Sequence, residues 1–206
     1  MFEVIKPRLE TILSTIANKM VAIGITANMV TLFGFFVNLI ATFYFATGHL
    51  ITGGILILFG GSFDMIDGAV ARAQRSLRPS GALLDSVMDR YSEGFLFLGA
   101  LIYFSGLESL LGIILAFGAW FGSILVSYVR ARAEGLQITC NVGLMQRPER
   151  IILLGIGALL QGVLWYKFSI VQSTGMVLLC TLGILTLTSH ITAVHRLIFS
   201  YQELGR

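Results

Sequence analysis

Long apolar runs are the feature that most constrains this chain. They recur from residue 27 to residue 198, and each is close to the roughly 20 residues with which a helix crosses about 30 Å of hydrocarbon. Membrane barrels need alternating polarity, whereas the runs 113–126 and 176–187 are apolar on every face. We therefore expect an all-α integral membrane protein with six transmembrane helices. The expected spans are 27–48, 51–73, 81–103, 109–130, 150–166 and 170–194.

Composition supports this class. Of the 206 residues, 56% are hydrophobic and 12% are charged, and the mean hydropathy is +0.85. Such a mixture excludes a soluble globular domain and a disordered chain. The formal net charge is +3, but the basic residues are spread over loops and the ends of apolar runs, so we expect no nucleic-acid partner. Cys140 and Cys180 show no disulfide or metal-ligand spacing and are expected to be unrelated thiols.

The first 22 residues differ from the rest of the chain. Apolar residues recur there at helical spacing, and the charged residues Lys6, Glu10 and Lys19 lie elsewhere on the helical wheel. This pattern predicts an amphipathic juxtamembrane helix over residues 1–22 that lies in the membrane surface. Together with a six-helix bundle over 27–198, it makes residues 1–206 a single membrane domain.

Basic residues are distributed asymmetrically about the expected spans. On one side lie Lys6, Arg8, Lys19, Arg72, Arg75, Arg78, Arg130, Arg132, Arg147, Arg150, Arg196 and Arg206. Of the basic residues in the connections and termini, Lys167 alone falls on the other side. The positive-inside rule therefore predicts that both termini and the connections 73–80 and 130–150 are cytoplasmic.

All of the chain's aspartates lie at the predicted cytoplasmic ends of the second and third spans. They are Asp64, Asp67, Asp85 and Asp89. Spacings of three and four residues place each pair on one face of a helix. Carboxylates at a membrane are costly unless a cation compensates them. Four of them make a hard oxygen site that suits one or two Mg²⁺ or Mn²⁺ ions, and two such ions can clamp a displacement at phosphorus.

Small residues and an arginine surround these aspartates. Gly68 follows Asp67 directly, Ala71 and Arg72 follow one turn later, and Gly81 lies four residues before Asp85. Small side chains let a ligand approach backbone and ions, and an arginine can bind phosphate with two donors. A structural network of ion pairs with Arg72, Arg75 and Arg90 is the alternative, but it would not need the small residues.

In fixed register, these residues reproduce the D-x2-D-G-x2-A-R-x8-G-x3-D-x3-D signature of the CDP-alcohol phosphotransferase family. The matching positions are Asp64, Asp67, Gly68, Ala71, Arg72, Gly81, Asp85 and Asp89. The family's six helices and preceding juxtamembrane helix resemble nearly the whole chain. The resemblance implies a homodimeric membrane enzyme that takes the phosphatidyl group of CDP-diacylglycerol or CDP-archaeol, transfers it to an alcohol and releases CMP.

The resemblance also implies a role for each residue of the signature. It makes Asp64, Asp67 and Asp85 metal ligands and Asp89 the general base and a further ligand. The implied nucleotide and diphosphate contacts are Asp67, Gly68, Ala71, Arg72 and Gly81. No serine, cysteine or histidine lies in the signature, so we expect direct displacement rather than a covalent intermediate.

A second element lies at the start of the first span. Thr26, Asn28 and Thr31 resemble the family's T-P-N-x-x-T motif, with Ala27 in place of its proline. Asn28 and Thr31 are therefore candidate nucleotide contacts, and a helix N-cap is an equally good interpretation of these residues.

Arginines at the ends of the later spans suggest the acceptor. They are Arg130, Arg147, Arg150 and Arg196. Topology alone places arginines at such ends, but two at one helix start are well placed for an anion, so we expect a phosphorylated acceptor. Segments 85–93, 127–135 and 143–150 resemble the family branch that uses inositol phosphate. Glycerol 3-phosphate is the alternative acceptor.

A protein of another class, an ion-coupled transporter, could also use acidic residues in a membrane. The predicted position of the acids near one membrane face, rather than at its midplane, argues against it. Gly118 and Gly122 form a G-x-x-x-G pair that lets two helices approach closely.

Overall fold

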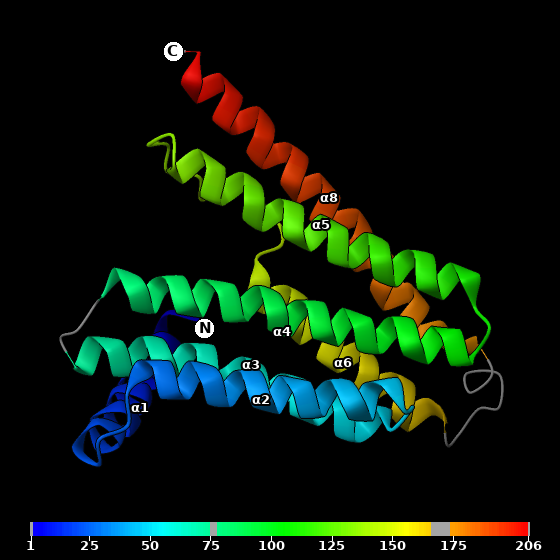
Figure 1. The fold of residues 1–206 in the computed structure, drawn as a ribbon, viewed down its shortest axis with the longest axis horizontal. Helices are drawn as coiled ribbons and strands as arrows, with labels where there is room; N and C mark the ends of the chain where they lie inside the picture. Colours follow the sequence, from blue (N-terminus) through cyan, green and yellow to red (C-terminus); the bar gives the residue numbers. More distant parts are fainter. Residues whose placement is uncertain (1, 75–77, 166–173, 206) are drawn as a thin grey trace.

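The computed structural model describes residues 2–74, 78–165 and 174–205, and every regular element in these ranges is an α-helix. The helices are α1 (Phe2–Ala22), α2 (Ala27–Ala46), α3 (Leu50–Ala73), α4 (Pro79–Gly106), α5 (Leu110–Glu134), α6 (Arg147–Trp165) and α8 (Met176–Leu204) (Figure 1). The expectation of an all-α protein is therefore confirmed for the described residues.

Four of the described helices are long and apolar enough to cross a membrane, namely α2, α3, α5 and α8. Helices α4 and α6 lie in the same bundle, but α4 carries charged residues between Asp85 and Glu93, and α6 carries them in its first turn. The uncharged remainders, 94–106 and 151–165, are shorter than a full span. Six transmembrane helices thus remain a prediction. Residues 170–173, the start of the last expected span, and Lys167 lie outside the described residues.

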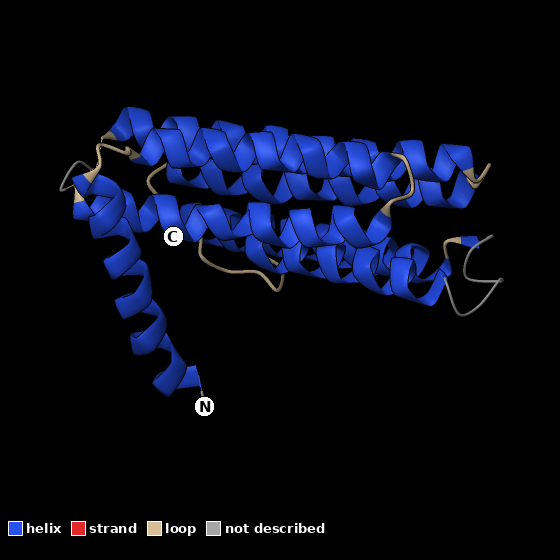
Figure 2. Cartoon of the chain, turned by 90° about the horizontal axis from the view of Figure 1, so that it is seen from below, coloured by secondary structure: helices blue, strands red, loops and turns tan. Residues whose placement is uncertain are grey.

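The long helices run side by side, and α1 leaves the bundle at a steep angle (Figure 2). Helix α2 packs on α3 and α4, α3 packs on α6, and α5 packs on α8. The end of α1, the end of α3, the start of α4 and the C-terminus all lie toward one end of the bundle (Figure 1). The segments predicted to be cytoplasmic therefore gather at a common end.

Two apolar clusters hold the helices together. The larger one joins the bundle helices through buried residues such as Phe45, Ile57, Phe97 and Leu182. The smaller one lies beneath α1, where Ala17 meets Val30, Ala69 and Val70, and where Leu13 and Met20 pack at its edge. Helix α1 is thus confirmed as a helix that buries part of an apolar face, and its position in the membrane surface stays a prediction.

Glycines bring α3 and α6 into backbone contact. A Cβ atom added at Gly54 would lie 2.8 Å from the carbonyl oxygen of Gly155 and 2.9 Å from the nitrogen of Leu159. At Gly162 it would lie 2.9 Å from the nitrogen of Ile51. These contacts set the position of α6 relative to α3, and α6 carries two of the predicted acceptor arginines in its first turn.

Gly54→Ala is expected to destabilise the protein by about 1–3 kcal/mol, because the new methyl group meets backbone that cannot move aside on its own. Thermal unfolding in detergent measures the loss. Gly183→Ala is the matched control, since nothing lies within 4 Å of its added Cβ, and alanine favours a helix. Equal melting temperatures for the two variants would contradict the close contact.

The G-x-x-x-G pair on α5 packs against α8. An added Cβ would lie 2.9 Å from Thr186 Cγ2 at Gly118 and 2.9 Å from Ser189 Cβ at Gly122. His190 Nε2 lies 3.2 Å from the carbonyl oxygen of Gly118. The predicted close approach of two helices is therefore confirmed, and the partner is a helix of the same chain.

Candidate active site

The structure brings the aspartates together where α3 ends and α4 begins. Asp64 and Asp67 lie on the last turns of α3, and Asp85 and Asp89 lie near the start of α4. Asp67 is buried, and Asp64, Asp85 and Asp89 are close enough to repel one another. The sequence prediction that both pairs share one site is therefore correct, and we call these four residues the acidic cluster.

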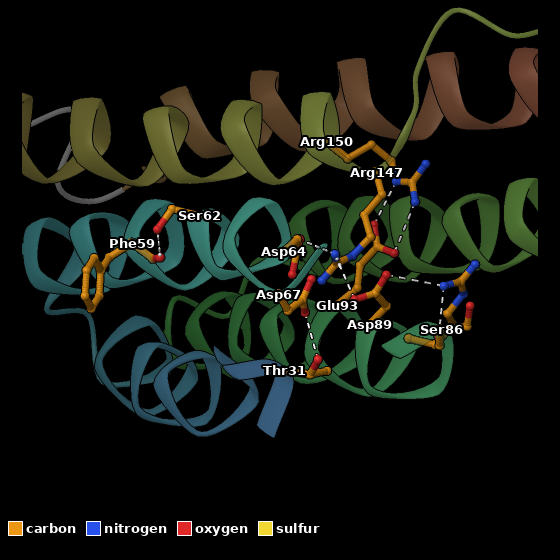
Figure 3. Close-up of polar contacts among 11 residues, drawn as sticks. Thr31, Phe59, Ser62, Asp64, Asp67, Ser86, Asp89, Glu93, Arg147 and Arg150 are labelled. Atoms are coloured by element: carbon orange, nitrogen blue, oxygen red, sulfur yellow. Dashed lines mark hydrogen bonds and ion pairs between the residues drawn. The ribbon is translucent and has the colours of Figure 1, made fainter. Parts of the chain in front are cut away.

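Arg147, from the first turn of α6, reaches into the acidic cluster (Figure 3). Its Nη1 atom contacts Asp64 Oδ2 and lies 2.9 Å from Asp89 Oδ1. Arg90 adds a longer contact, 3.5 Å from Nη1 to Asp89 Oδ2. The sequence named Arg90 as a possible partner but assigned Arg147 to the acceptor, because no local spacing links residues 83 positions apart.

The start of α2 contributes to the same site. Thr31 Oγ1 donates a hydrogen bond of 2.7 Å to Asp67 Oδ2. Asn28 lies beside α4, with its Oδ1 atom 3.3 Å from a Cβ added at Gly81. Thr26 is the N-cap, since its hydroxyl accepts from the backbone N–H of Met29 at 3.4 Å. The N-cap interpretation thus holds for Thr26, while Thr31 contacts the acidic cluster and Asn28 lies beside Gly81.

Little surrounds Gly68, the first of the signature's small residues. A Cβ added at Gly68 would meet only the Nη1 atom of Arg72, at 3.5 Å. Arg72 is exposed, and Ala71 and Gly81 are half-buried. Gly68 thus leaves room beside Arg72, and the nucleotide contacts of these residues stay a prediction. Arg75, named in the structural alternative, lies outside the described residues.

Glu93 and Arg150 form a second, fully buried ion pair that sequence reasoning missed. Arg150 Nε lies 2.7 Å from Glu93 Oε1, and Arg150 Nη2 lies 3.2 Å from Glu93 Oε2. Their side chains are 1% and 2% exposed. Glu93 follows Asp89 by one turn of α4, and that spacing is the signal that could have placed it at the site.

A cavity of about 1020 Å³ opens between α4 and α5, beside the acidic cluster. Asp89 lies in its wall, and so do all of the predicted acceptor arginines: Arg130, Arg147, Arg150 and Arg196. Part of the wall is apolar and includes Phe117 and Trp120. The structure thus joins the predicted general base and the predicted acceptor arginines in one space.

The arginines that line the cavity differ in the contacts that they make with other groups of the protein. Arg130 Nε lies 2.8 Å from Glu134 Oε1 in an exposed pair. Arg196 is buried and donates to the carbonyl oxygens of Val142 and Val126, at 2.8 and 2.9 Å. Arg196 therefore fastens the connection between α5 and α6 to α8, in addition to lining the cavity.

The acidic cluster fits a divalent cation in its chemistry but is not arranged as a ligand shell. Among the described residues, no three acidic, histidine or cysteine side chains converge as a metal-binding group. Arg147 contacts one oxygen of Asp64 and one of Asp89 in this arrangement. Asp85 Oδ1, however, is buried without a hydrogen-bond partner in the described chain. A buried carboxylate oxygen left unpaired, with further carboxylates near it, suits a hard cation.

Comparisons with known proteins support the signature. The family model for CDP-alcohol phosphatidyltransferase matches residues 24–194. The archaetidylinositol phosphate synthase of Methanothermobacter thermautotrophicus is 37% identical over 201 residues, which are 97% of this chain and 93% of that protein. The phosphatidylinositol phosphate synthase of Mycobacteroides abscessus is 32% identical over 185 residues, covering 89% of this chain and 83% of that protein.

Solved structures agree with these matches. The phosphatidylinositol phosphate synthase of Mycobacterium tuberculosis with CDP-DAG bound superposes with a TM-score of 0.81 at 31% identity, covering 93% of this chain and 94% of that one. The same enzyme in complex with manganese and citrate gives a TM-score of 0.78 at 30% identity, covering 92% and 88%. Signature, fold and relatives agree: this chain belongs to the CDP-alcohol phosphatidyltransferase family and is a transferase of phospholipid biosynthesis.

Proposed function

We propose that this enzyme transfers the phosphatidyl group of a CDP-linked lipid, CDP-diacylglycerol or CDP-archaeol, to a hydroxyl of inositol phosphate and releases CMP. The observation that supports inositol phosphate as the acceptor is the cavity whose wall contains Asp89 and four arginines, Arg130, Arg147, Arg150 and Arg196. The positive charge at this cavity suits an acceptor that brings its own phosphate, whereas serine would not need it. Arg150 and Arg196 line the cavity while Glu93 and backbone carbonyl oxygens engage them. The names of the relatives in both comparisons point to the same acceptor class.

Asp89 is the general base of this proposal. Its carboxylate lies in the cavity wall and also belongs to the acidic cluster, so it stands between the spaces assigned to acceptor and donor. The acceptor oxygen forms a bond to the phosphatidyl phosphorus as the bond from that phosphorus to the CMP oxygen breaks. The proton of the acceptor hydroxyl passes to Asp89, and a step of this kind is typically worth about 10²–10⁴ in rate.

Asp64, Asp67, Asp85 and Asp89 would hold Mg²⁺ or Mn²⁺, two ions in our proposal. Bound ions supply neutralising charge for the diphosphate and for CMP as it leaves. Thr31 orients Asp67 through its hydrogen bond. Arg72 serves the diphosphate, and Gly68, Ala71, Gly81 and Asn28 surround the nucleotide. The manganese in the M. tuberculosis relative supports a divalent cation here.

The membrane placement completes the proposal. Helices α4 and α6 cross the membrane beside α2, α3, α5 and α8, and α1 lies in the surface of the cell membrane. Both termini and the active site face the cytoplasm. The common end that the structure gives to α1, the acidic cluster and the C-terminus supports this orientation (Figure 1). Residues 1–206 form one domain, and two copies of it form a homodimer.

The identity of the acceptor is tested by following CMP release from CDP-diacylglycerol in detergent that contains Mg²⁺. The reaction is run with inositol phosphate, glycerol 3-phosphate, serine or no acceptor. We expect release that requires inositol phosphate, stops with EDTA and returns with Mg²⁺ or Mn²⁺. Release driven by glycerol 3-phosphate alone would contradict the acceptor and leave the chemistry intact. If no acceptor drives release from either CDP-diacylglycerol or CDP-archaeol, the proposed function is wrong.

A further inference from the structure

Two arginine–carboxylate contacts join the same two helices, one turn apart. On α4, Asp89 and Glu93 are four residues apart, and on α6, Arg147 and Arg150 are three apart. Arg150 pairs with Glu93, and Arg147 pairs with Asp89 (Figure 3). The two contacts are alike in charge and position but differ in the number of their hydrogen bonds and in their burial.

The Glu93–Arg150 pair is closed. Two different nitrogens of Arg150 meet the two oxygens of Glu93, and Nη1 of Arg150 lies 3.4 Å from the carbonyl oxygen of Met145. Both side chains are almost completely buried. Because water cannot reach this bidentate pair, it cannot replace the hydrogen bonds that either side chain would lose on separation. This pair therefore holds the first turn of α6 against α4 permanently.

The contact of Arg147 has fewer hydrogen bonds and is more exposed. A single nitrogen, Nη1, serves both Asp64 and Asp89. The Nε atom of Arg147 is buried and has no hydrogen-bond partner in the described chain. Side-chain exposure is 15% for Arg147, 15% for Asp89 and 33% for Asp64. A guanidinium that leaves a donor unpaired and reaches partly solvated carboxylates is held less firmly than Arg150.

Charge in the acidic cluster remains unbalanced. Arg147 and the half-exposed Arg90 face four carboxylates, so negative charge is left over. A divalent cation held by Asp64 and Asp89 competes with Nη1 of Arg147 for the same two carboxylates, since Nη1 contacts one oxygen of each. Two cations cannot share those oxygens at close range, because like charges repel strongly in a partly buried site. Binding of the cation therefore opposes this contact of Arg147.

A displaced Arg147 has a place to go. Its side chain already lies in the wall of the 1020 Å³ cavity, together with Arg130 and Arg196. The closed Glu93–Arg150 pair keeps the backbone of α6 in position while the Arg147 side chain changes its rotamer. Turned into the cavity, the guanidinium can pair with an anion through its unused donors.

We propose that Arg147 is an exchangeable counter-ion: it neutralises Asp64 and Asp89 until a divalent cation binds, and then turns into the cavity, where it binds the phosphate of the acceptor. The second half of this proposal rests on the proposed function. Metal and acceptor phosphate are then coupled, since each favours the same position of Arg147, and such coupling is reciprocal. Arg147 is then a substrate-binding residue that becomes available to the acceptor once the metal has bound.

Mn²⁺ titration of the substrate-free protein, read by the electron paramagnetic resonance of free Mn²⁺, tests the exchange. Arg147→Met is expected to bind Mn²⁺ about tenfold more tightly than the parent, because the competing cation is gone. Arg90→Met is the matched control. It removes the same charge from Asp89, but the Arg90 contact is longer and more exposed, so the expected gain is below about threefold.

The outcomes separate exchange from a general charge effect. Equal gains in Arg147→Met and Arg90→Met, or unchanged or weaker binding in Arg147→Met, would overturn the exchange. Thermal melting checks that each variant is folded, and Arg147→Gln serves in place of Arg147→Met if the latter does not fold. Arg147→Lys, which keeps the charge, is expected to return Mn²⁺ affinity toward that of the parent.

Steady-state kinetics test the second half. With saturating Mn²⁺, Arg147→Met is expected to raise the acceptor KM about tenfold or more and to change kcat less, since its charge serves acceptor binding. An unchanged KM would overturn the role at the acceptor. If inositol phosphate supports no turnover in the parent but Mn²⁺ affinity rises in Arg147→Met, the exchange stands and the proposed acceptor fails. If inositol phosphate does support turnover in the parent but Mn²⁺ affinity does not rise in Arg147→Met, the exchange is wrong and the proposed function is unaffected.

Discussion

Asp89→Asn is expected to lower the rate of CMP release by about 10²–10⁴-fold, the usual worth of a general base. Asparagine has nearly the same shape as aspartate but cannot take the proton of the acceptor hydroxyl. Asp89 is the one residue of the acidic cluster that also lines the cavity described between α4 and α5. The loss should therefore appear in kcat at saturating acceptor, lipid and Mg²⁺.

Glu134→Gln is the matched control for this variant. Glu134 is another carboxylate in the cavity wall, and it forms an exposed pair with Arg130 at 2.8 Å. Because exposed pairs contribute little, we expect Glu134→Gln to change the rate by less than about threefold. Thermal melting in detergent shows whether each variant is folded. If folded Asp89→Asn keeps more than about a tenth of the parent rate, another group accepts the proton.

Arg150→Met is expected to cost about 3–5 kcal/mol of stability, because it leaves the Glu93 carboxylate buried without its partner. Glu93 is 2% exposed, so water cannot replace the lost guanidinium. The loss is measured as a lower unfolding temperature and a lower unfolding midpoint in denaturant. Glu93→Gln should lose stability for the corresponding reason, since Arg150 then keeps an uncompensated charge.

The double variant Glu93→Leu with Arg150→Met separates burial of a charge from loss of packing. Replacing both partners of a buried ion pair with apolar groups is often neutral, so the double variant should recover most of the stability lost in Arg150→Met. If the double variant loses as much as the single variants combined, the pair stabilises the fold directly and our account of its cost is wrong.

Hydropathy predicted where helices exist better than where they end. The third expected span ends at residue 103 and the last at 194, whereas α4 continues to Gly106 and α8 to Leu204. Likewise, α6 begins at Arg147, three residues before the expected start. Each of these helices continues beyond the apolar run that reveals it. A helix can pass from hydrocarbon into water without a change in its hydrogen bonds, so hydropathy alone does not mark the end.

The acidic cluster was predictable because its spacing is local. Asp64 and Asp67 are three residues apart on one helix, and Asp85 and Asp89 are four apart on the next. The ion pairs were not predictable from the sequence, because Arg147 lies 83 positions from Asp64 and Arg150 lies 57 positions from Glu93. Such pairs depend on how α6 packs against α3 and α4, and that packing follows from glycine contacts whose partners the sequence does not reveal.

Arg196 gives the C-terminal helix a part in the cavity that we propose as the acceptor site. It lies two residues beyond the segment that the family model matches and beyond the apolar run of the last expected span. From there it holds the connection between α5 and α6 through Val142 and closes one side of the cavity. A chain that stopped at residue 194 would keep all six expected spans and lose Arg196 from the wall of the proposed acceptor site. The last turns of α8 thus belong to the catalytic unit, and the limits of the membrane segment are not the limits of the enzyme.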